Sequence, residues 1–156
     1  MGDHDESTQM ESGEAYQRFL EEARGEPIRF IKHDTNAHDD EAVYRMVSEN
    51  GMAHYGWYWL LVECLMGRKG HTYDVSDDIG WKRLAYDMGC LCDLKPARCR
   101  QIVECFKSYG LISEEHYAEG RVAIPRILRD AETYAEGVAD KKLGAWKTNR
   151  KRRGGA

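Results

Sequence analysis

Basic and amide side chains in the segment 95–109 form the first group whose types and spacing suggest a chemistry, and they are Lys95, Arg98, Arg100, Gln101 and Lys107. Arginine, lysine and glutamine hydrogen-bond to base edges and phosphates, so this set is typical of a helix that contacts nucleic acid. Glu104 lies in the middle of the same face, and the segment 114–120 is acidic. Both would repel phosphate, which favours the alternative of a solvated helix with mixed charge.

A second basic group lies at the C-terminal end, where residues 141–153 hold seven bases and no acid. Its members are Lys141, Lys142, Lys147, Arg150, Lys151, Arg152 and Arg153, with Trp146 among them. Such a run is typical of a basic arm that binds nucleic acid. The alternative is a solubilising end that pairs with residues 1–27, which hold eight acids and two bases, and such pairing would be autoinhibitory. The overall net charge of −4 is therefore a poor guide to partners.

Metal binding and catalysis find less support in the sequence. The cysteines Cys90, Cys92, Cys99 and Cys105 lack the paired spacing of zinc knuckles, so we expect small buried side chains rather than ligands. The loop 33–40 offers carboxylates but lacks the glycine and the closing glutamate of a calcium loop, and it is better explained as a helix cap. No nucleophile, phosphate-binding or metalloprotease motif is present, so we expect no enzyme activity, no metal and no cofactor.

Cellular context follows from the cysteines and the N-terminal composition. Five cysteines is an odd number, and the first 27 residues contain no apolar run of the kind found in signal peptides. We therefore expect free thiols in a reducing cytoplasm, and no membrane partner.

The stretch 51–66, GMAHYGWYWLLVECLM, predicts the central helix of the domain. Apolar residues fall on nearly every side of a helical period, which indicates burial, and the stretch is too short for a bilayer, which needs roughly 20 apolar residues. A helix over 40–50 precedes it, with Asp39 as the expected N-cap and Gly51 as the C-cap. If the surrounding helices leave some of its aromatic side chains uncovered, the exposed patch would favour a homo-oligomer.

The remaining elements complete a helix-turn-helix pattern. We expect an extended segment over 71–75, then a helix over 78–88 capped by Ser76 or Asp77 with Ile79, Leu84, Ala85 and Met88 inward. The helix 95–109 follows, with Asp93 as N-cap, a buried stripe of Cys99, Ile102, Val103 and Phe106, and Gly110 as its stop. Strands 111–112 and 121–124 then form a hairpin, and a last helix buries Ile127, Leu128, Ala131, Tyr134 and Val138.

The predicted fold is mainly α: a winged helix-turn-helix with a two-stranded wing and additional N- and C-terminal helices. Residues 1–27 form an acidic tail with room for a short helix over 14–24, and residues 28–125 form the winged-helix domain. Residues 126–143 form the C-terminal helix, and residues 144–156 a basic disordered tail.

Aromatic, acidic and glycine residues follow a recognisable order from the loop 33–39 into the central helix, namely Phe30, His33, Asp34, Asp39, Gly51, Gly56, Tyr58, Trp59 and Glu63. In this pattern, and across residues 28–125, the chain resembles the Lin1244/Lin1753-like N-terminal family of phage and prophage proteins, which is related to replisome organisers and DnaD-type primosome proteins. His38 and Glu41 depart from it, because the family usually has arginine or lysine there, and many members continue into a second domain. The resemblance implies a DNA-binding winged helix of a replication initiation protein without catalytic residues. It also implies the cytoplasm of a bacterial or phage-infected cell.

The competing interpretation is a protein-interaction domain. In that case the winged helix contacts a helicase loader or another partner subunit, the acidic segment 114–120 makes the contact, and DNA is not bound. The charge of the recognition face distinguishes the two.

Overall fold

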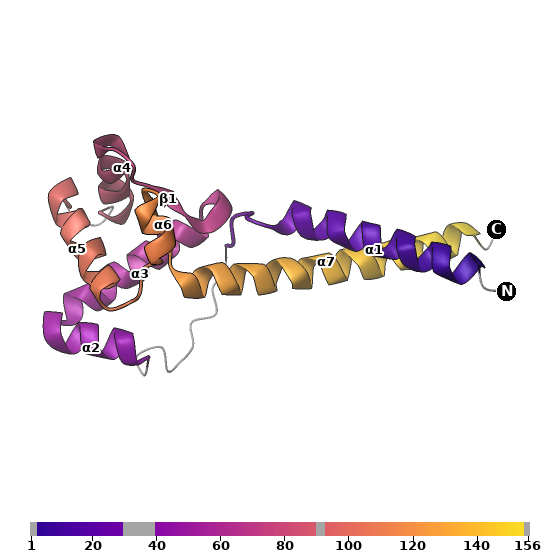
Figure 1. Cartoon of the computed structure of the whole chain (residues 1–156), viewed down its shortest axis with the longest axis horizontal. Coiled ribbons are helices and arrows are strands. Elements are labelled where there is room, and N and C mark those ends of the chain that lie inside the picture. Colours follow the sequence, from indigo (N-terminus) through magenta and orange to yellow (C-terminus); the bar gives the residue numbers. More distant parts are fainter. Residues whose placement is uncertain (1–2, 30–39, 90–92, 155–156) are drawn as a thin grey trace. The chain divides into compact units, whose positions relative to one another are not determined.

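A computed structural model describes residues 3–29, 40–89 and 93–154 (Figure 1). The chain divides into two compact units, residues 27–129 and residues 1–26 with 130–156, and each is described by itself. The elements in chain order are α1 (Asp3–Ala23), α2 (Glu41–Asn50), α3 (Met52–Met66), η2 (Lys69–His71), β1 (Tyr73–Asp74), α4 (Asp78–Met88), α5 (Pro96–Ser108), α6 (Glu114–Ala118), β2 (Arg121–Val122) and α7 (Pro125–Gly154).

The core of the unit 27–129 lies where α3, α4 and α5 pack against one another. Its fully buried side chains include Leu61, Leu65, Leu84, Met88, Ile102, Val103 and Phe106. The predicted central helix exists, but only one side of it is buried, because Met52, Gly56 and Glu63 are exposed.

Local capping signals explain where the helices of this unit begin. Asp40, whose Oδ1 accepts from the backbone N–H of Ala42 at 3.0 Å, caps α2, and Asp77 caps α4 by accepting from Gly80 N at 2.7 Å. The predicted cap Asp39 lies outside the described residues. Asp93 does not cap α5, since Lys95 is the N-cap residue there and makes no side-chain cap hydrogen bond.

Gly110 ends α5 as predicted. Its φ of 75° is left-handed, a conformation that glycine adopts without a Cβ penalty. Leu111 N donates to Phe106 O at 3.0 Å and Gly110 N donates to Lys107 O at 2.9 Å, which satisfies two carbonyls at the helix end. This turn directs Leu111 and Ile112 back into the core, where both are buried.

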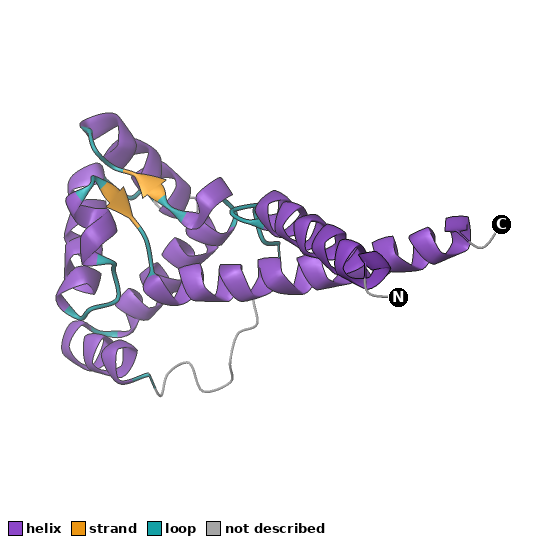
Figure 2. Cartoon of the chain, turned by 45° about the vertical axis from the view of Figure 1, so that its right-hand side comes forward, coloured by secondary structure: helices purple, strands orange, loops and turns teal. Residues whose placement is uncertain are grey.

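The small sheet differs from the predicted hairpin. β1 pairs with β2 in antiparallel register, with Tyr73 opposite Val122 and Asp74 opposite Arg121 (Figure 2). The strand predicted at 111–112 is wrong: the residues after it form α6, which Ser113 caps. A serine followed by two glutamates is a strong helix start, so the stretch between the two expected strands forms a helix. The fold remains mainly helical with a two-stranded antiparallel sheet, in a winged-helix-like arrangement.

Two glycines allow the backbone of the sheet to approach its neighbours closely. A Cβ on Gly80 of α4 would lie 2.4 Å from the carbonyl oxygen of Asp74. Gly120, with a φ of 74°, accepts from Val75 N at 2.8 Å, and a Cβ there would lie 2.9 Å from Ser76 Cα. Neither position has space for a side chain, so both glycines are needed where β1, β2 and α4 meet.

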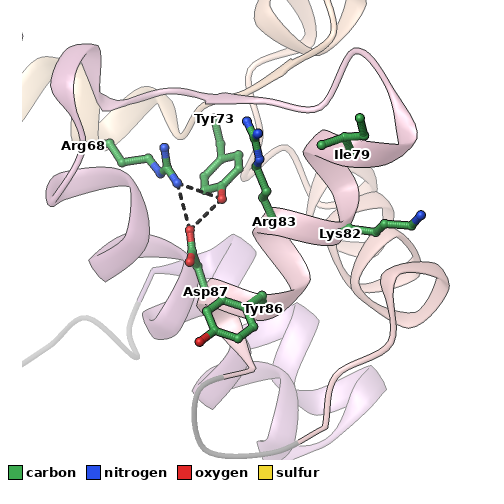
Figure 3. A pocket seen from close by; sticks show the side chains of 7 residues that line it. All are labelled: Arg68, Tyr73, Ile79, Lys82, Arg83, Tyr86 and Asp87. Atoms are coloured by element: carbon green, nitrogen blue, oxygen red, sulfur yellow. Dashed lines mark hydrogen bonds and ion pairs between the residues drawn. The ribbon is translucent and has the colours of Figure 1, made fainter.

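A polar contact joins α4 to the segment before it (Figure 3). Arg68 donates to Tyr73 Oη and to Asp87 Oδ2, each at 2.8 Å, and Tyr73 Oη donates to the same Asp87 oxygen at 2.6 Å. The Arg68 guanidinium also lies over the Tyr73 ring, 3.8 Å from its centroid. Burial would raise the pKa of Asp87, but the hydrogen bonds from Tyr73 and Arg68 outweigh it and lower that pKa below its ordinary value.

The other unit consists of α1 and the part of α7 from residue 130 onward. Leu20, Ala135 and Ala139 are buried between them, flanked by Tyr16, Phe19 and Ala23. Tyr134, predicted to face inward, is 53% exposed, because the alanines occupy the contact face instead.

Ion pairs connect the two helices of this unit along their length. Arg24 pairs with Glu132 at 2.6 Å, Lys142 with Glu22 at 2.9 Å, and Arg150 with Glu11. α7 continues to Gly154, so residues 144–154 are helical rather than disordered, and α1 begins at Asp3 rather than at residue 14. Opposite charges on the facing helices favour this extension.

Substituting Gly80→Ala tests the close approach of α4 to β1. The added Cβ must displace backbone, so we expect the free energy of unfolding to fall by about 1–3 kcal/mol. Urea unfolding followed by tryptophan fluorescence, in a Trp146→Phe background that removes the signal of α7, measures this. The control is Gly56→Ala in α3, which meets nothing within 4 Å and is expected to stabilise the protein by up to about 1 kcal/mol. Equal effects of the two substitutions would contradict the packing described.

Substituting Asp87→Asn tests the polar contact through its pH dependence. The folded-state pKa of Asp87 is lowered, so its stabilisation is present above the unfolded-state pKa of about 4 and is lost as pH falls through the folded-state value. We expect a loss of about 1 kcal/mol at pH 7 that shrinks progressively as pH falls below about 4. Urea unfolding at a series of pH values measures it, with Asp93→Asn as control because its pair with Lys95 is exposed. A pH-independent loss would rule out the ionised carboxylate as the cause.

Candidate nucleic-acid interface

The exposed face of α5 carries the residues predicted to contact nucleic acid. Cys99, Ile102, Val103 and Phe106 are all fully buried, as predicted from their spacing. Arg98, Arg100 and Gln101 lie on the opposite side and are exposed, Lys107 is partly buried, and Lys95 is exposed at the N-cap. The structure therefore places the residues predicted within segment 95–109 on one helix and at its N-cap.

Most of these cations already contact an acid. Arg100 Nε pairs with Glu104 Oε1 at 3.2 Å and its guanidinium lies 5.5 Å from the Trp81 ring centroid. Lys107 pairs with Glu114 of α6 at 3.0 Å, and Lys95 with Asp93 at 2.6 Å. Arg98 donates to Gln101 Oε1 at 3.3 Å. Hydrogen bonding to Glu104 raises the pKa of Arg100, so its charge persists.

These pairs reduce the positive potential of the face without abolishing it. Exposed ion pairs are worth roughly 0–1 kcal/mol each, so a phosphate can replace a carboxylate at small cost. α6 adds Glu115, and Glu119 at the end of α6 pairs with Arg121. The acidity predicted for segment 114–120 is therefore present, on a helix that directly follows α5.

The C-terminal cations lie on α7 rather than on an unstructured arm. Lys147, Lys151 and Arg152 are exposed. Arg150 pairs with Glu11 and lies 5.3 Å from the Trp146 ring centroid. Arg153 belongs to the same helix, and its side chain lies outside the described residues. The helix therefore spaces these charges at fixed intervals along one element.

A further group, which the sequence prediction missed, lies on α4. Ile79, predicted to be buried, is 55% exposed, and Tyr86 is 82% exposed. Together with Lys82 and Arg83 they line a pocket of about 360 Å³ that also contacts Arg68, Tyr73 and Asp87 (Figure 3). The sequence feature that could have revealed this group is the helical spacing of residues 79, 82, 83 and 86, which places them on one face of α4.

The cysteines behave as packing residues where they are described. Burial raises the pKa of the Cys99 thiol to about 12 and also raises that of Cys105. Within residues 3–29, 40–89 and 93–154, no three His, Cys, Asp or Glu side chains group as a metal site would need. Cys90, Cys92 and the loop 33–39 lie outside the described residues, so the metal prediction is not tested there.

None of the described helices has the length and apolar content needed to cross a bilayer.

Comparison with protein families gives one match, to the model described as Lin1244/Lin1753-like, N-terminal, over residues 30–124. Comparisons with curated proteins and with solved structures give no match. The matched residues are more than half of the 156 and coincide with the unit that contains α3, α4 and α5. The chain therefore belongs to the Lin1244/Lin1753-like N-terminal family.

Proposed function

We propose that this chain is a non-catalytic DNA-binding module of a phage or prophage replication initiation protein, acting in the bacterial cytoplasm. The observation that carries the proposal is the orientation of α5. Its four apolar stripe residues are completely buried, so its basic and amide side chains face solvent where a DNA groove can reach them. A family whose description names an N-terminal part is in keeping with a module of a larger protein.

In this proposal the residues of α5 divide by position. Arg98 and Gln101 lie in the first half of the helix, the part that usually enters the major groove, and their donors suit base edges. Arg100 and Lys107 supply phosphate contacts, exchanging Glu104 and Glu114 for phosphate oxygens.

The cations of α7 add affinity that does not depend on sequence. Lys147, Lys151 and Arg152 are exposed, and a row of cations on a helix attracts the phosphate backbone. Arg150 contributes only after its pair with Glu11 opens.

One observation favours a second candidate function, a protein-interaction domain. Glu114 and Glu115 of α6 are exposed directly after α5 and suit a basic surface on a helicase loader or partner subunit. If the chain bound neither single- nor double-stranded DNA at low salt, this interpretation would replace the first.

The double substitution Arg98→Ala with Arg100→Ala tests the α5 contact. We expect affinity for a fluorescein-labelled duplex to fall at least about tenfold. The slope of log affinity against log salt should become less negative by about 1, because Arg100 is the one of the two assigned to phosphate. Fluorescence anisotropy across a salt series measures both. Arg29→Ala with Arg129→Ala removes the same charge from two other exposed positions of the unit and serves as control. Equal losses in both double variants would reduce the α5 contact to a general charge effect.

The triple substitution of Lys147, Lys151 and Arg152 by glutamine tests the α7 contact. We expect weaker binding to every duplex alike, with the salt slope less negative by about 3. Preference between duplex sequences, measured by competition, is expected to stay as in the parent. A changed preference would place sequence readout on α7, contrary to the proposal.

A further inference from the structure

We propose that the exposed face of α4 is a binding site for single-stranded nucleic acid, with Tyr86 stacking on an unpaired base and with Lys82 and Arg83 holding the adjacent phosphates. This inference rests on the proposed function in so far as the chain binds nucleic acid, but it concerns a different helix and a different strand state. We call Ile79, Lys82, Arg83 and Tyr86 the α4 face.

The four side chains share one side of α4. Their spacing of three and four residues places them together, opposite the buried Gly80, Trp81, Leu84, Ala85 and Met88. Tyr86 is 82% exposed and Ile79 is 55% exposed, and Tyr86 is the more exposed of the two aromatic side chains, Tyr44 and Tyr86, that the described part of the unit presents most fully to solvent. The Tyr86 ring therefore offers nearly its whole surface to a ligand.

The positive charge of the α4 face is available, unlike that of α5. Lys82 and Arg83 have no ion pair within the part of the chain that the structure describes, whereas Arg100 and Lys107 are each paired with a glutamate. Asp87, whose carboxylate lines the same pocket, already accepts hydrogen bonds from Arg68 and Tyr73.

One more carboxylate acts on Arg83. Asp74 attracts its charge, and the pKa of Asp74 is lowered mainly because its side chain accepts hydrogen bonds from Ser76. Asp78, at the start of α4, is exposed and lies one residue before Ile79. Neither forms an ion pair with the α4 face in the described residues, so a phosphate does not have to displace them.

The pocket beside the face is already formed. It has a volume of about 360 Å³, and Tyr73, only 3% exposed, and Arg68 contribute to its lining (Figure 3). The hydrogen bonds among Arg68, Tyr73 and Asp87 fix the lining side chains. Figure 3 shows Arg83 and Tyr86 extending from the same helix along the pocket, with Lys82 pointing away to the other side.

An exposed aromatic ring with cations on both sides is the arrangement that binds unpaired bases. Every base has a π face, so stacking tolerates any sequence, and the cations follow the sugar-phosphate backbone. Bases in a duplex are stacked on their neighbours and cannot reach the ring, so the site selects single strands. Ile79 extends the apolar surface next to the stacked base. An acidic peptide would satisfy the cations but would leave the flat ring without a matching plane.

Fluorescence anisotropy of the full chain with a fluorescein-labelled oligo-dT strand tests the proposal. We expect Tyr86→Ala to weaken binding about 5- to 100-fold, and Tyr86→Phe, which keeps the ring, to bind within about twofold of the parent. Lys82→Ala with Arg83→Ala is expected to make the salt slope less negative by about 1.4. A strand of the same length without bases should bind the parent as weakly as oligo-dT binds Tyr86→Ala.

Matched controls separate this site from the rest of the chain. Tyr44→Ala removes another tyrosine, 65% exposed on α2, and Arg29→Ala with Arg129→Ala removes two other cations. Both variants are expected to leave oligo-dT binding within about twofold of the parent. The inference is overturned if Tyr86→Ala binds oligo-dT like the parent, if the baseless strand binds equally well, or if polyglutamate competes as strongly as oligo-dT. Duplex binding that needs Arg98 and Arg100 is compatible with all of these results. The proposed function is therefore tested independently of the single-strand site on α4.

Discussion

Burial of one side of α5 against α3 and α4 is the constraint on which the outward side of the helix depends. Phe106 is fully buried and meets Tyr58 edge to face, with ring centroids 5.7 Å apart. Burying a side chain of this size stabilises the fold by roughly 1.5–3 kcal/mol. Because a helix is rigid and repeats every 3.6 residues, fixing Ile102 and Phe106 inward also fixes Arg98 and Gln101 outward.

The position of α4 depends on contacts of a different kind. Gly80 allows its backbone to touch that of β1, and Asp87 receives two hydrogen bonds from residues before the helix. These contacts use the side of α4 nearest the sheet and leave its other side free. The proposed contacts of α4 and α5 thus follow from how the inward sides of the two helices are held, and α7 belongs to a unit with its own contacts.

Predictions that rested on local signals were confirmed. The stripe of α5, the stop at Gly110 and the cap at Asp77 each depend on residues within one turn of the feature they define. The predicted hairpin was wrong because β2 pairs with Tyr73–Asp74, which is distant in sequence, and because the stretch between the two expected strands forms α6. Ile79 was misplaced because apolar character alone does not tell which side of a short helix is covered. The disordered tail predicted at 144–156 was wrong for residues 144–154, which are helical. This helix shares its unit with α1, which is distant in sequence, so local signals could not predict the extension. Which basic residues contact DNA stays a prediction, since exposure is necessary for such contact but does not establish it.

Pairing of the α5 cations with carboxylates is the feature that DNA would have to overcome under the proposed function. Arg100 and Lys107 are each paired with a glutamate, and exposed pairs of this kind are weak enough for phosphate to replace the carboxylate.

The most direct test of DNA contact through α5 is a titration of the ¹⁵N-labelled chain with duplex DNA, monitored by amide chemical shifts. The account predicts that the largest shifts fall on amides of α5 while those of α2 stay nearly unchanged. Shifts confined to α6 or α2, or no shifts at low salt, would contradict it.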